Sequence, residues 1–199
     1  MNRVLRLLSR FLRGEDVILV SQSKEHWNRQ FADGKWDRLV SGQANTSAIA
    51  ERVFQYLEEK RGRIRVLDIG CGNGGLAKLL TQEPRIMYTG IDIADTAISK
   101  AKELAPAGTF VVADAHTPPH DTGEFDVLIF NEVFFYMNPK ALLNYKKHAA
   151  PNARVLISLV RSWRTLSLLR RIRHFLHIET RFSVGDEEFR WDILTGRFI

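Results

Sequence analysis

The sequence predicts an α/β fold in which a mostly parallel sheet lies between two layers of helices. Apolar runs typical of strands alternate with helical patterns from about residue 64 onward. These runs are rich in Val, Ile, Leu and Phe, as expected of strands that are buried on both faces. The last two runs are joined by a turn that is too short for a crossover helix, so they should pair antiparallel. We therefore expect a three-layer α-β-α arrangement of seven strands, five of them parallel, with a C-terminal antiparallel hairpin.

Each strand and helix is predicted from apolar periodicity and from the residues at its ends. The parallel strands are expected at residues 63–69, 86–92, 109–113, 125–130 and 153–160, and the hairpin strands at 178–183 and 188–198. The helices between them are expected at residues 75–82, 95–104, 139–149 and 162–177. Asp95 and Asn138 are suitable N-caps for two of these helices.

Two further segments precede the first strand. Residues 46–60 carry a helical stripe of apolar side chains that should cover one face of the sheet. Residues 25–39 are too rich in aromatic side chains for a plain linker, and we expect them to form a lid over the sheet edge. The chain is thus divided into an N-terminal part, residues 1–44, with a basic amphipathic segment and the aromatic lid, and a domain of residues 45–199.

The composition excludes several classes of protein. At 199 residues, with 45% hydrophobic and 26% charged residues, the chain is long enough for one domain with a core. Its single cysteine, Cys71, excludes an internal disulfide framework and a multi-cysteine metal site, and suits a reducing cytoplasm. No apolar run reaches the roughly 18 to 20 residues of a membrane-spanning helix. Residues 1–13 are interrupted by arginines, unlike a secretory signal, so we expect a cytoplasmic protein. We expect no metal site.

The net charge of +6 is concentrated in two short segments. Residues 1–13 contain four arginines and no acid, and residues 161–178 contain five arginines and no acid. The remainder is net acidic, which disfavours nucleic acid as a partner of the whole protein. The apolar face of residues 1–13 leaves two interpretations open: peripheral docking on the anionic inner face of a membrane, or self-packing or disorder. Residues 161–178 should form a core helix with a solvated basic face.

A glycine-rich segment, residues 66–75, ends the first predicted strand and opens a helix. Glycines let the backbone turn sharply and approach a ligand, while the N–H groups of the helix start point toward it. Gly70, Gly72 and Gly75 also satisfy the G-x-G-x-x-G spacing of dinucleotide sites. The glycines alone therefore leave the ligand open.

Three acidic residues at successive strand ends narrow the choice of ligand. Asp68 stands two residues before the first glycine, where it would attract a cation and repel a pyrophosphate. Asp92 ends the next strand, where its oxygens can accept hydrogen bonds from both ribose hydroxyls. Asp114 follows the third strand and can accept a hydrogen bond from the exocyclic amine of adenine. The pattern predicts a cationic, ribosylated ligand without phosphate.

The segment from Asp68 to Gly74 resembles the acid-x-Gly-x-Gly-x-Gly signature of the Rossmann-like S-adenosylmethionine-dependent methyltransferases. The resemblance extends over residues 45–199 and includes residues 125–133 and 189–194. It implies S-adenosylmethionine as cofactor, with the glycine loop and Asp68 around the methionyl part. The residues that it implies at the cofactor are Asp68, Gly70, Cys71, Gly72, Gly74, Asp92 on the ribose, Ile93 on the adenine face, Asp114 and Ala115 on the adenine edge, and Asn131.

Residues after the fourth strand are the candidates on the acceptor side, because ligands of open α/β sheets bind at the carboxyl ends of the strands. Glu132 and Tyr136 are the candidate catalytic residues. Many small-molecule members of the family have a histidine at the place matched by Tyr136, so a histidine-base mechanism is not carried over. His116 is an alternative base, although a lone loop histidine is more often solvated. Cys71 is given no catalytic role.

The resemblance implies methyl transfer to an O or N atom of a small-molecule, sugar or glycolipid acceptor. Residues 130–136 are similar to bacterial methyltransferases of the nodulation and polysaccharide-modifying kind. The sequence lacks an Asn-Pro-Pro-Tyr motif after the fourth strand, which disfavours methylation of nucleobase amines. Trp27 and Trp36 are expected either to cover the ligand or to pack in the core. An RNA methyltransferase and a catalytically silent cofactor-binding module remain open as alternatives.

Overall fold

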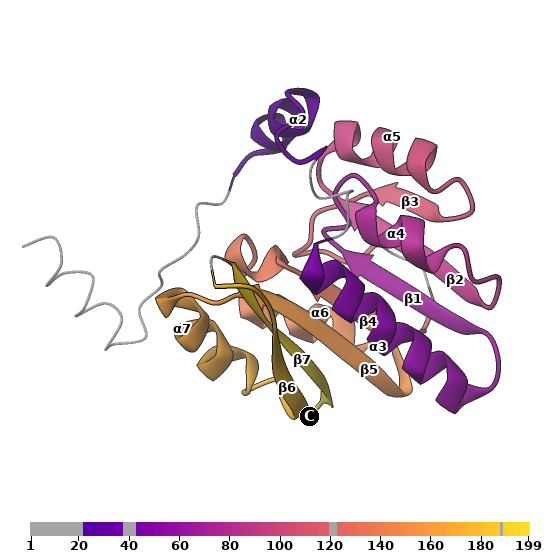
Figure 1. Ribbon diagram of the computed structural model, residues 1–199, viewed down its shortest axis with the longest axis vertical. Helices are drawn as coiled ribbons and strands as arrows, with labels where there is room; N and C mark the ends of the chain where they lie inside the picture. The colour runs from indigo at the N-terminus through magenta and orange to yellow at the C-terminus, as the bar shows by residue number, and fades with distance from the viewer. Residues whose placement is uncertain (1–21, 38–42, 120–122, 188) are drawn as a thin grey trace, which may run out of the picture.

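The computed structural model describes residues 22–37, 43–119, 123–187 and 189–199 (Figure 1). The predicted basic segment, residues 1–13, lies outside these ranges. The described residues form a seven-stranded sheet in the order β3-β2-β1-β4-β5-β7-β6. The strands are β1 (Ile64–Ile69), β2 (Ile86–Asp92), β3 (Thr109–Val112), β4 (Phe125–Asn131), β5 (Ala149–Val160), β6 (Leu176–Gly185) and β7 (Arg190–Phe198). The predicted fold class is confirmed.

The first five strands pair in parallel, and only β7 of the described strands runs in the opposite direction. β1 pairs with β2 and β4, β2 with β3, and β4 with β5, all in parallel. β7 pairs antiparallel with both β5 and β6, so the C-terminal hairpin closes one end of the sheet. Because the order reverses between β1 and β4, the crevice outside their carboxyl ends is the place where ligands bind in open α/β sheets.

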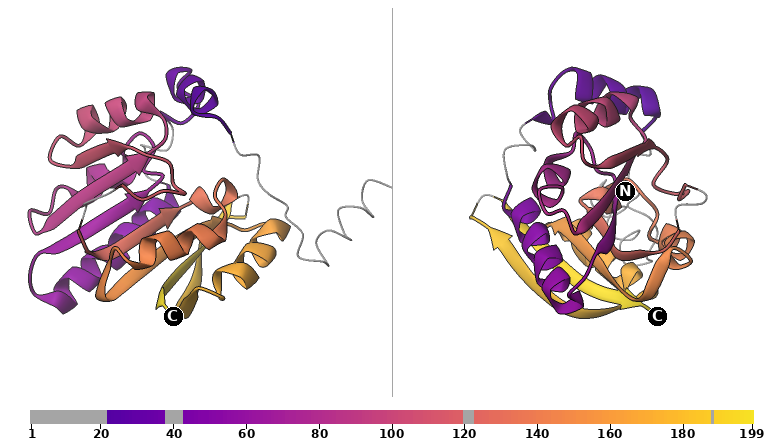
Figure 2. Two further views of the ribbon diagram at one scale, coloured as in Figure 1. Left: turned by 180° about the vertical axis from the view of Figure 1, so that it is seen from behind. Right: turned by 90° about the vertical axis from the view of Figure 1, so that its right-hand side faces the viewer.

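Helices cover both faces of the sheet (Figure 2). One face packs against α3, α4 and α5 through side chains such as Ile49, Leu76 and Ile98, and the other against α6 and α7 through Leu142 and Leu168. The helices are α2 (Lys24–Ala32), α3 (Ala44–Lys60), α4 (Gly75–Leu80), α5 (Asp95–Leu104), α6 (Leu142–Lys146) and α7 (Trp163–Ile172), with short 3-10 helices η2 (Val133–Phe135) and η3 (Pro139–Ala141). None of these described helices has the length and apolar character needed to cross a membrane.

Two predicted helices are shorter in the structure. The helix expected at residues 139–149 is a 3-10 turn followed by α6, and Ala149 already pairs with Phe125 in the sheet. The helix expected at residues 162–177 ends at Ile172, and β6 begins at Leu176. In both places, residues that local helical periodicity assigns to a helix form hydrogen bonds in the sheet instead.

One of the two predicted caps is wrong. Asn138 caps η3, because its side chain accepts the Lys140 N–H. Asp95, by contrast, is the first residue of α5, and the preceding Ala94 is the cap. The Asp92 carboxylate accepts the Ala94 N–H at 2.9 Å, and Asn28 Oδ1 of α2 accepts the Thr96 N–H at 3.1 Å, so the capping oxygens come from outside the helix. Asp95 instead pairs with Lys24 of α2 at 2.8 Å.

A buried asparagine joins α3 to the carboxyl ends of two central strands. Asn45 lies in the first turn of α3 and is only 1% exposed. Its amide donates to Asn131 Oδ1 at 3.0 Å and to Ser158 Oγ at 3.2 Å, at the ends of β4 and β5. Buried polar groups need such partners, so this contact fixes how α3 lies on the sheet.

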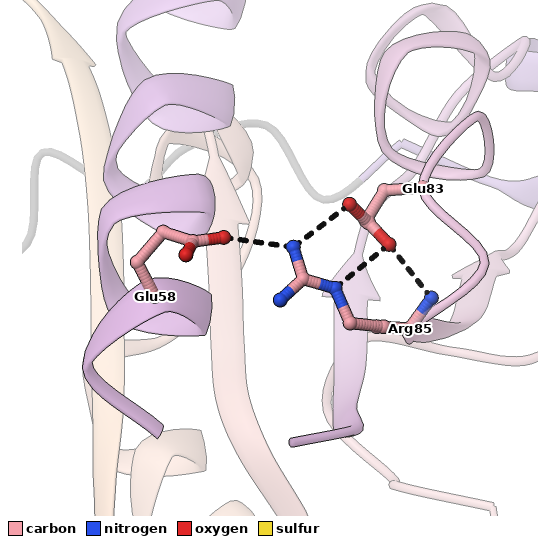
Figure 3. A network of polar contacts seen from close by, with 3 residues as sticks. All are labelled: Glu58, Glu83 and Arg85. Atoms are coloured by element: carbon pink, nitrogen blue, oxygen red, sulfur yellow. Dashed lines mark hydrogen bonds and ion pairs between the residues drawn. The ribbon is translucent and has the colours of Figure 1, made fainter. Parts of the chain in front are cut away.

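An ion-pair network lies at the opposite edge of the sheet, before β2 (Figure 3). Arg85 pairs with Glu83 at 3.0 Å and with Glu58 of α3 at 2.7 Å. The Arg85 bonds lower the pKa of the Glu83 carboxyl. Its side chain is 40% exposed, so solvent screens the pairs, and we assign them a role in orienting the turn rather than in stability.

Asp68 lies inside the molecule and not at its edge. Its side chain is 1% exposed, and its Oδ2 accepts the hydroxyl hydrogen of Tyr88 of β2 at 2.6 Å. Burial raises the pKa of Asp68 to about 7, because the ionised carboxylate loses its hydration there. The hydrogen bond from Tyr88 offsets part of that effect.

Replacing Asn45 by alanine should destabilise the fold by about 1 to 3 kcal/mol, because the buried Ser158 hydroxyl and the partly buried Asn131 oxygen lose their donor. Urea unfolding of the purified variant measures this change. Gln55→Ala on the exposed side of the same helix is the matched control and should stay within about 0.5 kcal/mol of the parent. Equal effects of the two substitutions would contradict the assigned role of Asn45.

The stability of the protein should fall as the pH rises from about 4 to about 7, because of Asp68. The folded state holds the Asp68 proton up to about pH 7, whereas the unfolded chain releases it near pH 4. Between these values the folded state binds more protons, so the free energy of unfolding declines by up to about 1.4 kcal/mol per pH unit. Urea unfolding from pH 4.5 to 7.5 should show a shallower decline for Asp68→Asn. An unchanged slope in that variant would refute the assignment.

Candidate active site

A cavity of about 360 Å³ opens at the carboxyl ends of the central strands, a volume typical of small-molecule sites. Its wall combines the loop after β1, the ends of β2, β3 and β4, and the segment that carries α2. Most of the predicted site residues line it, namely Gly70, Gly72, Asp92, Ile93, Asp114, Ala115, His116, Asn131, Glu132 and Tyr136. The structure thus brings together residues from four separate strand ends.

Three predicted cofactor residues do not line the cavity. Asp68 is buried against Tyr88, and Cys71 is 8% exposed in the core between β1 and β2. Burial raises the pKa of the Cys71 thiol well above its usual value. Gly74 is the N-cap of α4 and packs against Ala101 of α5. These residues support the loop from behind.

The loop after β1 needs glycine at the cavity wall. Gly70 has a φ of 75°, and a Cβ there would lie 2.9 Å from Cγ2 of Val133. The N–H groups of Gly70 and Cys71 both donate to the carbonyl of Ile91, at 2.8 and 3.0 Å. This double contact holds the loop tightly against the end of β2, so the backbone itself forms part of the wall.

Asp92 is a rigid carboxylate at the end of β2. Its Oδ2 accepts the Gly72 N–H at 3.0 Å and its Oδ1 accepts the Ala94 N–H at 2.9 Å. Burial raises its pKa, and these backbone donors offset part of the effect. Each carboxylate oxygen has a second lone pair, so Asp92 can still accept two hydrogen bonds from a diol in the cavity.

Asp114 and His116 form a pair at the end of β3. Asp114 Oδ1 lies 2.8 Å from both the backbone N and the ring Nδ1 of His116. The ring Nε2 accepts the Asn138 N–H at 3.1 Å. This arrangement assigns the hydrogen to Nδ1, so both ring nitrogens are occupied. His116 therefore orients Asp114 and lacks the free lone pair that an acceptor-side base requires.

Glu132 is the most constrained residue at the cavity. It adopts left-handed backbone angles, with φ 61°, which cost free energy in any residue but glycine. Its carboxylate accepts the Val160 N–H at 2.7 Å, and its own N–H donates to the Ser158 carbonyl at 3.0 Å. Burial raises the pKa of Glu132 to about 7. Burial also raises the pKa of Tyr136, and the nearby Glu132 charge raises it further.

Aromatic side chains from the segment around α2 cover the cavity. Trp27, Phe31 and Trp36 line it, and the Trp27 and Tyr136 rings meet edge to face with centroids 4.8 Å apart. Figure 1 shows α2 beside α5 at the edge of the sheet. The predicted lid thus lies over the cavity as far as Asp37; residues 38 and 39 are outside the described chain.

Polar contacts fasten the lid to the rest of the molecule, and the sequence gives no signal for them. Asn73 of the glycine loop donates to the Trp36 carbonyl at 3.1 Å. Lys100 of α5 donates to the Phe31 carbonyl and pairs with Asp37, both at 2.8 Å. Each partner is distant in the chain, so only the folded arrangement reveals these contacts.

Comparison with known proteins gives matches to methyltransferases. Residues 66–152 match the family model of a methyltransferase domain. The 27-O-demethylrifamycin SV methyltransferase of Amycolatopsis mediterranei is 30% identical over 118 residues, which are 56% of this chain and 43% of that protein. The chloroplastic tocopherol O-methyltransferase of Arabidopsis thaliana is 32% identical over 154 residues, 67% of this chain and 44% of that protein. The chain spans less than half the length of these relatives.

A solved structure extends the likeness over most of the fold. The N-methyltransferase NodS from Bradyrhizobium japonicum, in complex with S-adenosyl-L-homocysteine, has a TM-score of 0.63 to this chain. The alignment covers 86% of this chain and 98% of NodS at 15% identity, so the likeness concerns the fold. The family match includes the glycine loop and the strands that carry the cavity. By its glycine-loop motif, its fold and these matches, the chain is similar to the class I S-adenosylmethionine-dependent methyltransferases.

Proposed function

We propose that this chain transfers a methyl group from S-adenosylmethionine to an N or O atom of a small-molecule acceptor bound in the cavity. The observation that carries the proposal is the pair of carboxylates, Asp92 and Asp114, at neighbouring strand ends beside the backbone loop of Gly70 and Gly72. None of the described residues that line this cavity is a lysine or an arginine. The wall therefore suits a cationic adenosyl compound better than a dinucleotide with its pyrophosphate.

The residues at the cavity fit the parts of this cofactor. Asp92 would accept hydrogen bonds from the two ribose hydroxyls, since both of its oxygens retain a lone pair. Ile93 and Ala115 would contact the adenine, and Asp114, oriented by His116, would accept from its amine. The loop at Gly70 and the carboxamide of Asn131, held by Asn45, would face the methionyl part. Asp68 would act through the loop and not by contact.

Catalysis in this site would consist mainly of aligning the acceptor atom with the methyl group of the cofactor. The bound cofactor supplies a methyl group already activated by the positive sulfur. The fixed loop and the aromatic lid would hold the acceptor in line and exclude water, which contributes on the order of 7 to 11 kcal/mol in well-oriented reactions. Glu132, held by the Val160 N–H, would accept a proton from the acceptor, and Tyr136 would orient it. A sugar or glycolipid acceptor and a cytoplasmic location stay predictions, as does the division of the chain at residue 45.

S-adenosylmethionine and S-adenosylhomocysteine should each bind and raise the melting temperature, whereas NAD should do neither. Replacing Asp92 by asparagine should weaken binding of both by about 10- to 100-fold, because charged hydrogen bonds to the ribose are lost. Isothermal titration calorimetry measures the dissociation constants. Glu58→Gln, in the exposed network far from the cavity, is the matched control and should bind like the parent. Stabilisation by NAD alone would overturn the proposal that S-adenosylmethionine is the cofactor.

Glu132→Gln and Tyr136→Phe should both bind S-adenosylmethionine like the parent but differ from it in turnover. The loss of the proton acceptor in Glu132→Gln should lower kcat by about 10²- to 10⁴-fold. Release of S-adenosylhomocysteine, followed by mass spectrometry with a panel of amine and hydroxyl acceptors, measures the rate. Turnover of Glu132→Gln at the parent rate would remove Glu132 from the mechanism. A parent that binds the cofactor and releases no product with any acceptor would favour the silent binding module.

A further inference from the structure

The charges around the cavity are of one sign. Its described lining residues include the acids Asp92, Asp114 and Glu132 and no lysine or arginine, and both ring nitrogens of His116 are already engaged. Asp92 and Asp114 face the side assigned to the adenosyl group. Glu132 is left for the acceptor. An anionic acceptor would meet a carboxylate there with no lysine or arginine among the described lining residues to compensate it, whereas a cationic acceptor would be attracted to Glu132.

Glu132 has no charged partner among the side chains that the structure describes. The groups that lower its pKa are the backbone N–H of Val160 and the indole of Trp191, and both are neutral. A half-buried carboxylate without a cation carries a desolvation cost that a positive ligand would offset. The strained backbone of Glu132 and the 2.7 Å bond from Val160 hold the carboxylate at the cavity wall. The structure thus presents a carboxyl group in a fixed position to the acceptor.

Aromatic rings line the same cavity as Glu132. Glu132 and Tyr136 stand at the two ends of η2, and the Tyr136 ring meets Trp27 with centroids 4.8 Å apart. The Trp36 ring lies 5.8 Å from that of Trp27. Aromatic faces attract ammonium groups through the ring quadrupole, and this attraction grows when the site is shielded from water. A fixed carboxylate among aromatic rings is a combination suited to an ammonium ion.

Resting on the function proposed above, we infer that the acceptor is a cationic amine, that Glu132 and the rings of Trp27, Trp36 and Tyr136 bind its ammonium group, and that the methyl group is transferred to that nitrogen. Carboxylate and phosphate acceptors are disfavoured, because Glu132 would repel them. A neutral hydroxyl is disfavoured, because it is a far weaker acid than an ammonium ion and a carboxylate is a poor base for it.

The proton and electron balance is complete with these groups. The ammonium ion gives one proton to the Glu132 carboxylate, which frees the nitrogen lone pair. That lone pair attacks the methyl carbon, a nitrogen–carbon bond forms, and the carbon–sulfur bond breaks with its electron pair staying on sulfur. The products are a methylated ammonium ion and S-adenosylhomocysteine, and the Glu132 proton passes to water when the site opens. No further reactant is needed.

Three probes of one shape test the charge preference directly. The protein is first saturated with S-adenosylhomocysteine, as verified by calorimetry, and then titrated with 2-phenylethylamine, 2-phenylethanol or 3-phenylpropionate, with tryptophan fluorescence as the signal. We expect the amine to bind at least 10-fold more tightly than the alcohol, and the carboxylate more weakly than both. Failure of S-adenosylhomocysteine to bind would refute the proposed function, whereas the order of the three probes tests only the inference drawn here.

Variants assign the preference to Glu132. Glu132→Gln should weaken binding of the amine at least 10-fold and leave binding of the alcohol unchanged. Trp27→Leu should weaken binding of the amine more than binding of the alcohol. Glu58→Gln is the control for loss of an acid outside the cavity and should alter neither. Melting temperatures of the complexes with S-adenosylhomocysteine verify that each variant is folded. Equal binding of the three probes, preference for the carboxylate, no binding of any probe, or an amine affinity unaffected by Glu132→Gln would overturn the inference.

Discussion

The contact between the glycine loop after β1 and the end of β2 is the constraint on which the site depends. The Ile91 carbonyl accepts the N–H groups of Gly70 and Cys71, and the Asp92 carboxylate accepts the N–H of Gly72. Val133 packs where a Cβ of Gly70 would lie. The loop is therefore fixed by β2 on one side and by the segment after β4 on the other, at the point where the strand order reverses. A larger residue at position 70 would separate these segments and open the cavity wall.

Buried polar groups converge behind this wall. Asn45 joins α3 to Asn131 and Ser158, while Glu132 bonds to the backbone of β5 in a left-handed conformation. Each feature lowers the stability that an apolar core would provide, because polar atoms are buried and the backbone is strained. Local choices that conflict with stability are expected where a site must be held in one geometry. Their position at the cavity supports the functions proposed for Asn131 and Glu132.

The lid combines two kinds of contact with different strengths. Its aromatic side chains pack on one another and on Tyr136, and this packing shields the cavity from water. Its rim is held by exposed polar contacts, such as the pair of Lys100 with Asp37, which solvent screens. The shielding matters for the inferred acceptor, because the attraction of an ammonium ion to Glu132 and to aromatic rings is stronger where water is excluded.

The sequence by itself determined the α/β class, the antiparallel end of the sheet, the resemblance to methyltransferases, and most residues at the cavity, because strand periodicity and the glycine loop are local patterns. It did not determine where Asp68 and Asp95 point, nor that both nitrogens of His116 are engaged, because those depend on Tyr88, Lys24 and Asn138 from other segments. It also placed helix ends too late at residues 149 and 177, where pairing within the sheet overrides helical periodicity. Only the tertiary structure decided which polar groups remain available to a ligand, because that depends on contacts between residues far apart in the chain.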